Sequence, residues 1–116
     1  PIPKADIPRF LPEFLGGLLR IAHEDAQGYD VVHSHYWLSG WVGRAAKHAL
    51  DAPLVSSFHT LGKVKNYSLA RGERPEPPFR LSGEERVIAD ADRLVAAPLP
   101  ARRAARLNVL EALQYE

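Results

Sequence analysis

Three short segments rich in β-branched residues, separated by stretches with helical spacing, most constrain how this chain can fold. The segments are residues 29–34 (YDVVHS), 53–59 (PLVSSFH) and 93–97 (RLVAA). The intervals between them are too long for hairpin turns, so the strands must pair in parallel through crossovers, which are right-handed in such sheets. The pattern predicts an α/β protein, a three-layer α/β/α arrangement around a parallel sheet. Three strands make a small sheet, and we expect an incomplete domain.

Apolar residues at helical spacing locate the first two helices. The first helix is predicted over residues 9–27, with Gly28 placed to end it, after an extended proline-rich lead-in over residues 1–8. The second helix is predicted to begin at Ser39 and Gly40, which can cap it. Its expected apolar face consists of Trp41, Val42, Ala45, Ala46 and Ala49.

The second half of the chain opens with a basic linker. Residues 62–78 contain Lys and Arg side chains and the run PEPP, and they are predicted to form a mobile loop with room for a helical turn. The sequence Ser-Gly-Glu-Glu at 82–85 has the pattern of a capping box and predicts a helix to about Asp90. A last helix is predicted over residues 99–115.

Composition excludes several classes of protein. At 116 residues, with 46% apolar and 25% charged residues, the chain is one ordinary globular domain at most. Its formal net charge of +1 gives no reason to expect a nucleic-acid partner, and no apolar run is long enough for a membrane span. The chain has no cysteine, which excludes disulfides and thiolate metal sites and is compatible with the cytoplasmic location that we expect.

Polar side chains follow the first two predicted strands. Ligands of open parallel sheets bind outside the carboxyl ends of the strands. At its carboxyl end the first predicted strand leads into residues 33–37 (HSHYW), and the second leads into His59 and Thr60. The basic linker can fold over the same edge of the sheet. Hydroxyls, imidazoles and cations together suit a phosphorylated or polyhydroxylated ligand.

Less specific interpretations compete with a binding site. His33 and His35 share one face of a strand, but two ligands without a carboxylate are too few for a metal, so no metal site is predicted. Trp37 and Trp41 are more typical of a core. The Lys and Arg side chains of the linker are more typical of solvated loop residues. From the residues alone, the chain is a ligand-binding α/β domain.

Longer strings allow a more specific hypothesis. The chain contains YDVVHSHYWLSGWVG, then PLVSSFHTLGKVKN, then PEPPFRLSGEERVIADADRLVAA. These strings resemble glycosyltransferase family 4, in the subgroup with the mycothiol-pathway inositol-phosphate enzymes and sucrose-phosphate-synthase-like proteins. The resemblance implies the Rossmann-like, acceptor-side half of a GT-B fold. It also implies retaining transfer of a sugar from a UDP-sugar to a phosphorylated polyol or sugar such as inositol 3-phosphate.

The resemblance also implies roles for particular residues. Matching motifs place the contacts to the acceptor phosphate on Lys4, Tyr36, Thr60 and Arg80. His59 matches the family histidine near the reacting sugar, where it can support the transition state without acting as a general base. The full enzyme would bind a UDP-sugar donor, with Mg²⁺ as a possible ion, but this chain itself is expected to hold no cofactor.

The resemblance is partial. It assigns residues 1–97 to a partial N-terminal domain, whereas residues 98–116 do not match and form a separate tail. The family's glycine-rich loop and donor-binding domain are expected outside the chain, so the chain alone is expected to be inactive. A non-catalytic fragment that binds a sugar phosphate, an inositol phosphate or a partner is the alternative, and the sequence leaves the oligomeric state open.

Overall fold

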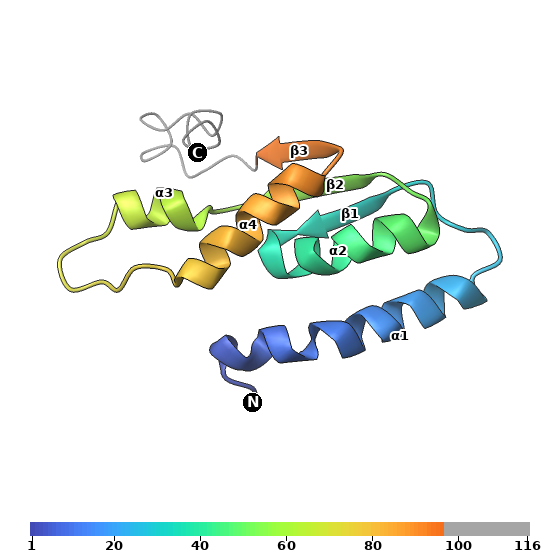
Figure 1. The fold of residues 1–116 in the computed structure, drawn as a ribbon, viewed down its shortest axis with the longest axis horizontal. Helices are drawn as coiled ribbons and strands as arrows, with labels where there is room; N and C mark the ends of the chain where they lie inside the picture. Colours follow the sequence, from blue (N-terminus) through green and yellow to red (C-terminus); the bar gives the residue numbers. More distant parts are fainter. Residues whose placement is uncertain (97–116) are drawn as a thin grey trace.

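The computed structural model describes residues 1–96 of the chain, and its centre is a three-stranded parallel sheet (Figure 1). The strands are β1 (Val32–His35), β2 (Leu54–Phe58) and β3 (Arg93–Ala96), in the order β1-β2-β3. Val32 pairs with Leu54, and Val55 pairs with Arg93. The predicted parallel α/β arrangement is therefore confirmed, and β1 and β2 are each shorter than the segment that predicted them.

Helices connect the strands and precede them. The chain begins with the 3₁₀ helix η1 (Lys4–Phe10) and continues through α1 (Leu11–Glu24), α2 (Tyr36–Leu50), α3 (Gly62–Tyr67) and α4 (Pro78–Asp90). In Figure 1, α2 returns along the strands from the end where they terminate, and α1 lies alongside α2. The last residue of the third predicted strand, residue 97, lies outside the described residues, as does the whole helix predicted over residues 99–115.

Glycines let α2 approach its neighbours closely. A Cβ added to Gly43 would lie 2.8 Å from Leu54 Cδ1 on β2, and one added to Gly40 would lie 2.6 Å from Val87 Cγ1 on α4. Only a residue without a side chain fits at either contact. The packing of α2 on the sheet and on α4 thus depends on the close approach of the α2 backbone to the side chains of Leu54 and Val87.

The predicted apolar face of α2 was wrong in part. Val42 and Ala46 are buried as expected, but Ala45, Ala49 and Trp41 are exposed. The buried face instead includes Gly40 and Gly43. Glycine has no side chain to add to an apolar pattern, so the pattern missed the positions that make the closest contacts.

The predicted boundaries before β1 also change. Residues 4–8, expected to be extended, belong to the 3₁₀ helix η1, and α1 ends at Glu24, before Gly28. The Asp25 carboxylate accepts hydrogen bonds from the Gln27 N–H (3.1 Å) and the Tyr29 hydroxyl (3.0 Å). These bonds order the turn in which Gly28 takes a left-handed φ of 69°.

The start of α4 corrects a second prediction. The helix begins at Pro78, and the Ser82 hydroxyl donates to the carbonyl of Phe79 instead of capping a helix (3.2 Å). Glu85 pairs with Lys63 on α3. Proline is favoured in the first turn of a helix because its fixed φ suits the helix and its missing N–H would have no partner there.

The helices that pack on the sheet in this part of the chain, α2 and α4, lie on one face of it. That face carries Leu54 and Ser34 opposite α2, and Phe58, which packs with Leu61 and with Val87 of α4. The alternate residues His33 and His35 point to the other face and are exposed. None of the helices in residues 1–96 has the length and apolar character required to cross a membrane.

Asp92 fixes the start of β3 beside β2. Its carboxylate accepts hydrogen bonds from the Leu54 N–H (2.8 Å) and the Lys47 ammonium (3.0 Å), and its own N–H donates to the Leu54 carbonyl (2.9 Å). The Leu54 N–H and then the Lys47 ammonium hold the pKa of Asp92 below its usual value, because both stabilise the carboxylate. The third strand is thereby joined to β2 and α2 together.

Two glycine-to-alanine substitutions test the close packing of α2. Gly40→Ala should lower the free energy of unfolding by about 1–3 kcal/mol, because the new methyl group forces Val87 or α4 to shift. Gly16→Ala in α1 meets nothing within 4 Å and should instead stabilise the chain by roughly 0.5–1 kcal/mol. Urea unfolding of both variants measures the difference, and equal effects would contradict the packing described above.

Candidate functional site

Polar groups from the ends of β1 and β2 meet at one edge of the sheet. The Tyr36 hydroxyl shares a hydrogen bond of 2.9 Å with the Thr60 hydroxyl. The Tyr36 ring stacks on the His59 imidazole with centroids 5.9 Å apart and planes inclined by 20°. All three side chains are exposed. Three of the five residues that the sequence proposed for the site meet here, and a fourth, Arg80, contacts two of them from α4.

Tyr36 joins β1 to α2 through an unusual backbone conformation. Its φ is 72°, in the left-handed region that non-glycine residues rarely adopt. Such a conformation costs on the order of 1 kcal/mol or more and often marks a functional position. The predicted start of α2 at Ser39 was wrong, because the helix begins at Tyr36, and the Ser39 hydroxyl donates to the His35 carbonyl from within the first turn.

A row of histidines extends from this edge along the exposed face of the sheet. His33 Nε2 lies 2.7 Å from Ser57 Oγ, and the rings of His33 and His35 are 4.4 Å apart. His35 Nδ1 lies 3.4 Å from His59 Nε2. Within residues 1–96, no group of three or more His, Asp or Glu side chains is arranged to hold a metal ion. These contacts place His59 at the end of a connected set of imidazoles.

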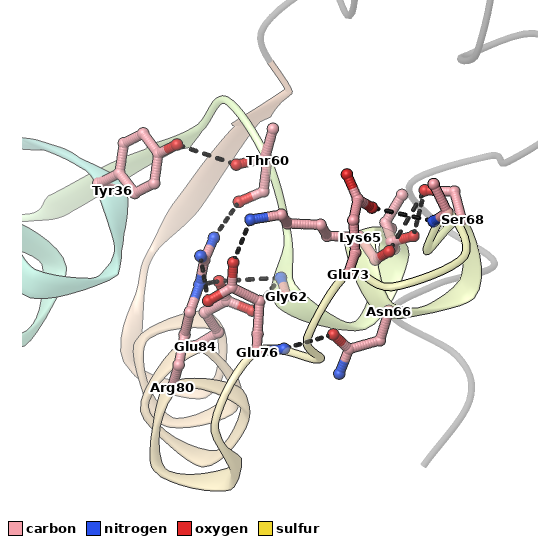
Figure 2. A network of polar contacts seen from close by, with 12 residues as sticks. Tyr36, Thr60, Gly62, Lys65, Asn66, Ser68, Glu73, Glu76, Arg80 and Glu84 are labelled. Atoms are coloured by element: carbon pink, nitrogen blue, oxygen red, sulfur yellow. Dashed lines mark hydrogen bonds and ion pairs between the residues drawn. The ribbon is translucent and has the colours of Figure 1, made fainter. Parts of the chain in front are cut away.

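Arg80 lies below the hydroxyl pair and is 5% exposed (Figure 2). Its guanidinium donates from Nε to Glu84 (3.0 Å), pairs through Nη1 with Glu76 (2.9 Å), and reaches the Thr60 carbonyl from Nη2 (3.4 Å). It also lies over the Tyr36 ring, 5.9 Å from the centroid. Arg80 thus supports both Tyr36 and Thr60 while its charge is balanced by two carboxylates. The direct contact with an acceptor phosphate stays a prediction.

Glu84 is the innermost member of this group. It is 3% exposed, and its two carboxylate oxygens accept the Gly62 N–H at 2.8 and 3.1 Å in addition to the Arg80 bond. Burial raises the pKa of Glu84, although the Gly62 and Arg80 hydrogen bonds act in the opposite direction. The carboxylate joins α4 to the first residue of α3, which follows Thr60 closely in the chain.

Glu76 connects the same arginine to a second cation. Its carboxylate bridges Arg80 and the Lys65 ammonium, and its backbone N–H donates to Asn66 Oδ1 (2.7 Å). The hydrogen bond from Lys65, and after it that from Arg80, lowers the pKa of Glu76 despite partial burial. Figure 2 shows the Glu76 carboxylate between these two cations, with Thr60 nearby.

Lys4 makes no contact with this group among the described residues. It is the first residue of η1, and its exposed side chain has no ion pair or hydrogen bond within residues 1–96. Its role at an acceptor phosphate stays a prediction, as does that of His59.

Sequence reasoning missed three members of the site: Glu76, Glu84 and Lys65. A signal was available for Glu84, because Arg80 and Glu84 are spaced by four residues on α4, and side chains at that spacing meet on a helix. Glu76 lies before the helix, and its contact with Arg80 depends on the path of the loop. The sequence is compatible with Lys65 as a solvated linker cation, because its ion pair with Glu76 forms only when the linker folds back on itself.

Comparison with known proteins identifies the class to which this fold and site belong. The glycosyl transferase 4-like domain family matches residues 1–114, and the chain belongs to that family. The parallel α/β arrangement corresponds to part of a GT-B glycosyltransferase. The division into segments at residue 97 stays a prediction.

Individual relatives agree with this assignment. The chain is 55% identical over 94 residues to a D-inositol 3-phosphate glycosyltransferase of Salinispora arenicola, covering 80% of this chain and 21% of the relative. It is 54% identical over 94 residues to the D-inositol 3-phosphate glycosyltransferase of Thermobispora bispora, covering 80% of this chain and 22% of the relative. The chain thus spans about a fifth of the length of these curated relatives.

A solved structure shows the same fold. Sucrose-phosphate synthase from Thermosynechococcus elongatus superposes with a TM-score of 0.67 and 28% sequence identity. The superposition covers 81% of this chain and 23% of that one.

Glu84 and its neighbour Glu85 provide a matched test of the buried ion pair. Glu84→Ala leaves Arg80 and the Gly62 N–H without their buried partner and should lower the free energy of unfolding by about 3–5 kcal/mol. Glu85→Ala removes only a half-exposed pair with Lys63 and should cost less than about 1 kcal/mol. Urea unfolding compares them, and similar losses would show that the Arg80 group does not support the fold.

Proposed function

We propose that this chain supplies the acceptor side of a retaining, UDP-sugar-dependent glycosyltransferase. In this proposal a hexosyl or N-acetylglucosaminyl group is transferred to a phosphorylated polyol or sugar, with inositol 3-phosphate as the first acceptor to test. The printed names of the curated relatives and the resemblance of the sequence support this choice. Since the chain spans about a fifth of those relatives, the activity belongs to a larger protein in this proposal.

The hydrogen-bonded pair of Tyr36 and Thr60, directly above a buried Arg80, is the observation that carries the proposal. A phosphate offers several acceptor oxygens and a double negative charge. Two hydroxyls can donate to those oxygens, and a guanidinium beside them supplies the charge-assisted contact. Lys65 adds a half-exposed cation on the same side (Figure 2).

His59 has a separate role in the proposal. Its exposed ring stacks on Tyr36 and therefore lies at the boundary between a phosphate held by Tyr36 and any group bound further out. From there a hydrogen bond to the donor sugar would stabilise charge as it develops in the transition state. A role as general base is not part of the proposal.

In this proposal the sugar donor does not bind to the acceptor side formed by this chain. A UDP-sugar, with Mg²⁺ if the enzyme uses it, would bind to another domain and meet the acceptor in the cleft between them. Transfer requires both substrates to be held together in the reactive geometry. We therefore expect the purified 116-residue chain to bind an acceptor without transferring sugar to it. A cytoplasmic location also stays a prediction.

Titration of the chain with inositol 3-phosphate tests the site. Thr60→Val removes the hydroxyl that pairs with Tyr36 and should weaken binding by about fivefold to tenfold, since one hydrogen bond to a charged group is lost. Lys4→Ala should weaken it by a similar factor, because in the proposal the Lys4 ammonium contacts the phosphate. Isothermal calorimetry gives the dissociation constants.

Arg74→Ala is the matched control for the loss of a cation. Arg74 is exposed in the loop between α3 and α4, and its removal should leave the affinity within about twofold of the original chain. Unchanged affinity in both Thr60→Val and Lys4→Ala would exclude the proposed acceptor site. Sugar transfer by the chain alone would exclude the proposal that the donor must bind to another domain.

A further inference from the structure

We propose that Glu76 is a specificity-determining residue of the acceptor site. Its carboxylate occupies the anion position between Arg80 and Lys65, and a phosphorylated acceptor binds by displacing it. This inference rests on the proposed function, because it assumes that the group beside Tyr36 and Thr60 receives a phosphate. It adds a competitor for that phosphate from within the chain.

The geometry of Arg80 leads to this inference. Each edge of the guanidinium already has a partner: Glu84 at Nε, Glu76 at Nη1 and the Thr60 carbonyl at Nη2. Because the Arg80 side chain is only 6% exposed, a phosphate is expected to reach its remaining N–H groups by taking the place of one of these partners. The Thr60 carbonyl is part of the backbone that positions the Thr60 hydroxyl, so one of the two carboxylates must leave.

Glu84 is poorly suited to leave. Its side chain is 4% exposed, and both of its oxygens accept the Gly62 N–H, which would be left buried without a partner. It also lies within α4, where its position is fixed by the helix.

Glu76 is much better suited to leave. It precedes α4, in the loop that connects α3 to α4 and extends away from the sheet in Figure 1. Its side chain is 12% exposed, and its second partner, Lys65, is 50% exposed. Apart from these two cations, Glu76 is held by the hydrogen bond from its N–H to Asn66 Oδ1. Displacement would therefore rearrange a surface loop and leave the core intact.

Charge determines which ligands can compete. Lys65 and Arg80 carry two positive charges, and Glu76 and Glu84 carry two negative charges, so the group is neutral without a ligand. A phosphate monoester carries about −1.5 to −2 charges near pH 7 and can replace the single charge of Glu76 with a gain in attraction. A polyol without phosphate offers no charge and cannot displace it. The internal carboxylate would thus select for phosphorylated acceptors.

Glu76→Gln in the 116-residue chain tests the inference by calorimetric titration with inositol 3-phosphate and with inorganic phosphate. The neutral amide competes weakly for the two cations, so both phosphate probes should bind about tenfold more tightly than to the original chain. Binding of unphosphorylated inositol should not change. Glu73→Gln is the matched control, because Glu73 lies in the same loop and accepts the Ala70 N–H without touching Arg80. It should leave both affinities unchanged.

The outcomes separate this inference from the proposed function. If the original chain binds inositol 3-phosphate and Glu76→Gln binds it equally or more weakly, the inference is overturned and the acceptor site stands. If neither protein binds either phosphate probe, both proposals are overturned. Asn66→Ala provides a second variant should Glu76→Gln fold poorly, because it frees the Glu76 N–H without changing any charge. Tighter phosphate binding is expected there too, and unchanged binding would overturn the inference.

Discussion

The buried pair of Arg80 and Glu84 is the interaction on which the arrangement of the candidate site depends. Glu84 holds the Gly62 N–H and Arg80 reaches the Thr60 carbonyl, so together they fasten the end of β2 and the start of α3 to α4. They anchor the chain that follows Phe58 to α4 from the buried side, in addition to the half-exposed ion pair of Lys63 and Glu85. The location of the Thr60 hydroxyl beside Tyr36 is therefore a consequence of an ion pair on another element.

Close packing at glycines fixes the other half of the site. Gly43 lets α2 lie against β1 and β2, and Gly40 lets it lie against Val87 of α4. With α2 held that close to the sheet, the chain must turn sharply between β1 and the helix. The left-handed conformation of Tyr36 occurs at this turn. The strain there is compatible with the fold because packing on both sides of α2 compensates for it.

The sequence predicted the sheet and the meeting of Tyr36, His59 and Thr60 for one physical reason. Consecutive parallel strands end at the same edge, so the residues that follow them are brought to the same edge of the sheet. Features that depend on tertiary contact could not be predicted in this way. The buried face of α2 depends on glycines that carry no apolar signal. The burial of Arg80 depends on a linker that folds back over α4.

The balance of charge around Arg80 follows from the energetics of burial. A guanidinium that is taken out of water without a counter-ion costs several kcal/mol, so a buried arginine beside a ligand site needs carboxylates whenever the site is empty. A permanent partner alone would stabilise the fold but would leave less positive charge for a ligand. Two partners of unequal exposure resolve this conflict, since Glu84 is held by the Gly62 N–H and Glu76 by a surface loop. The same cluster can then support the fold through one carboxylate and exchange the other for a phosphate.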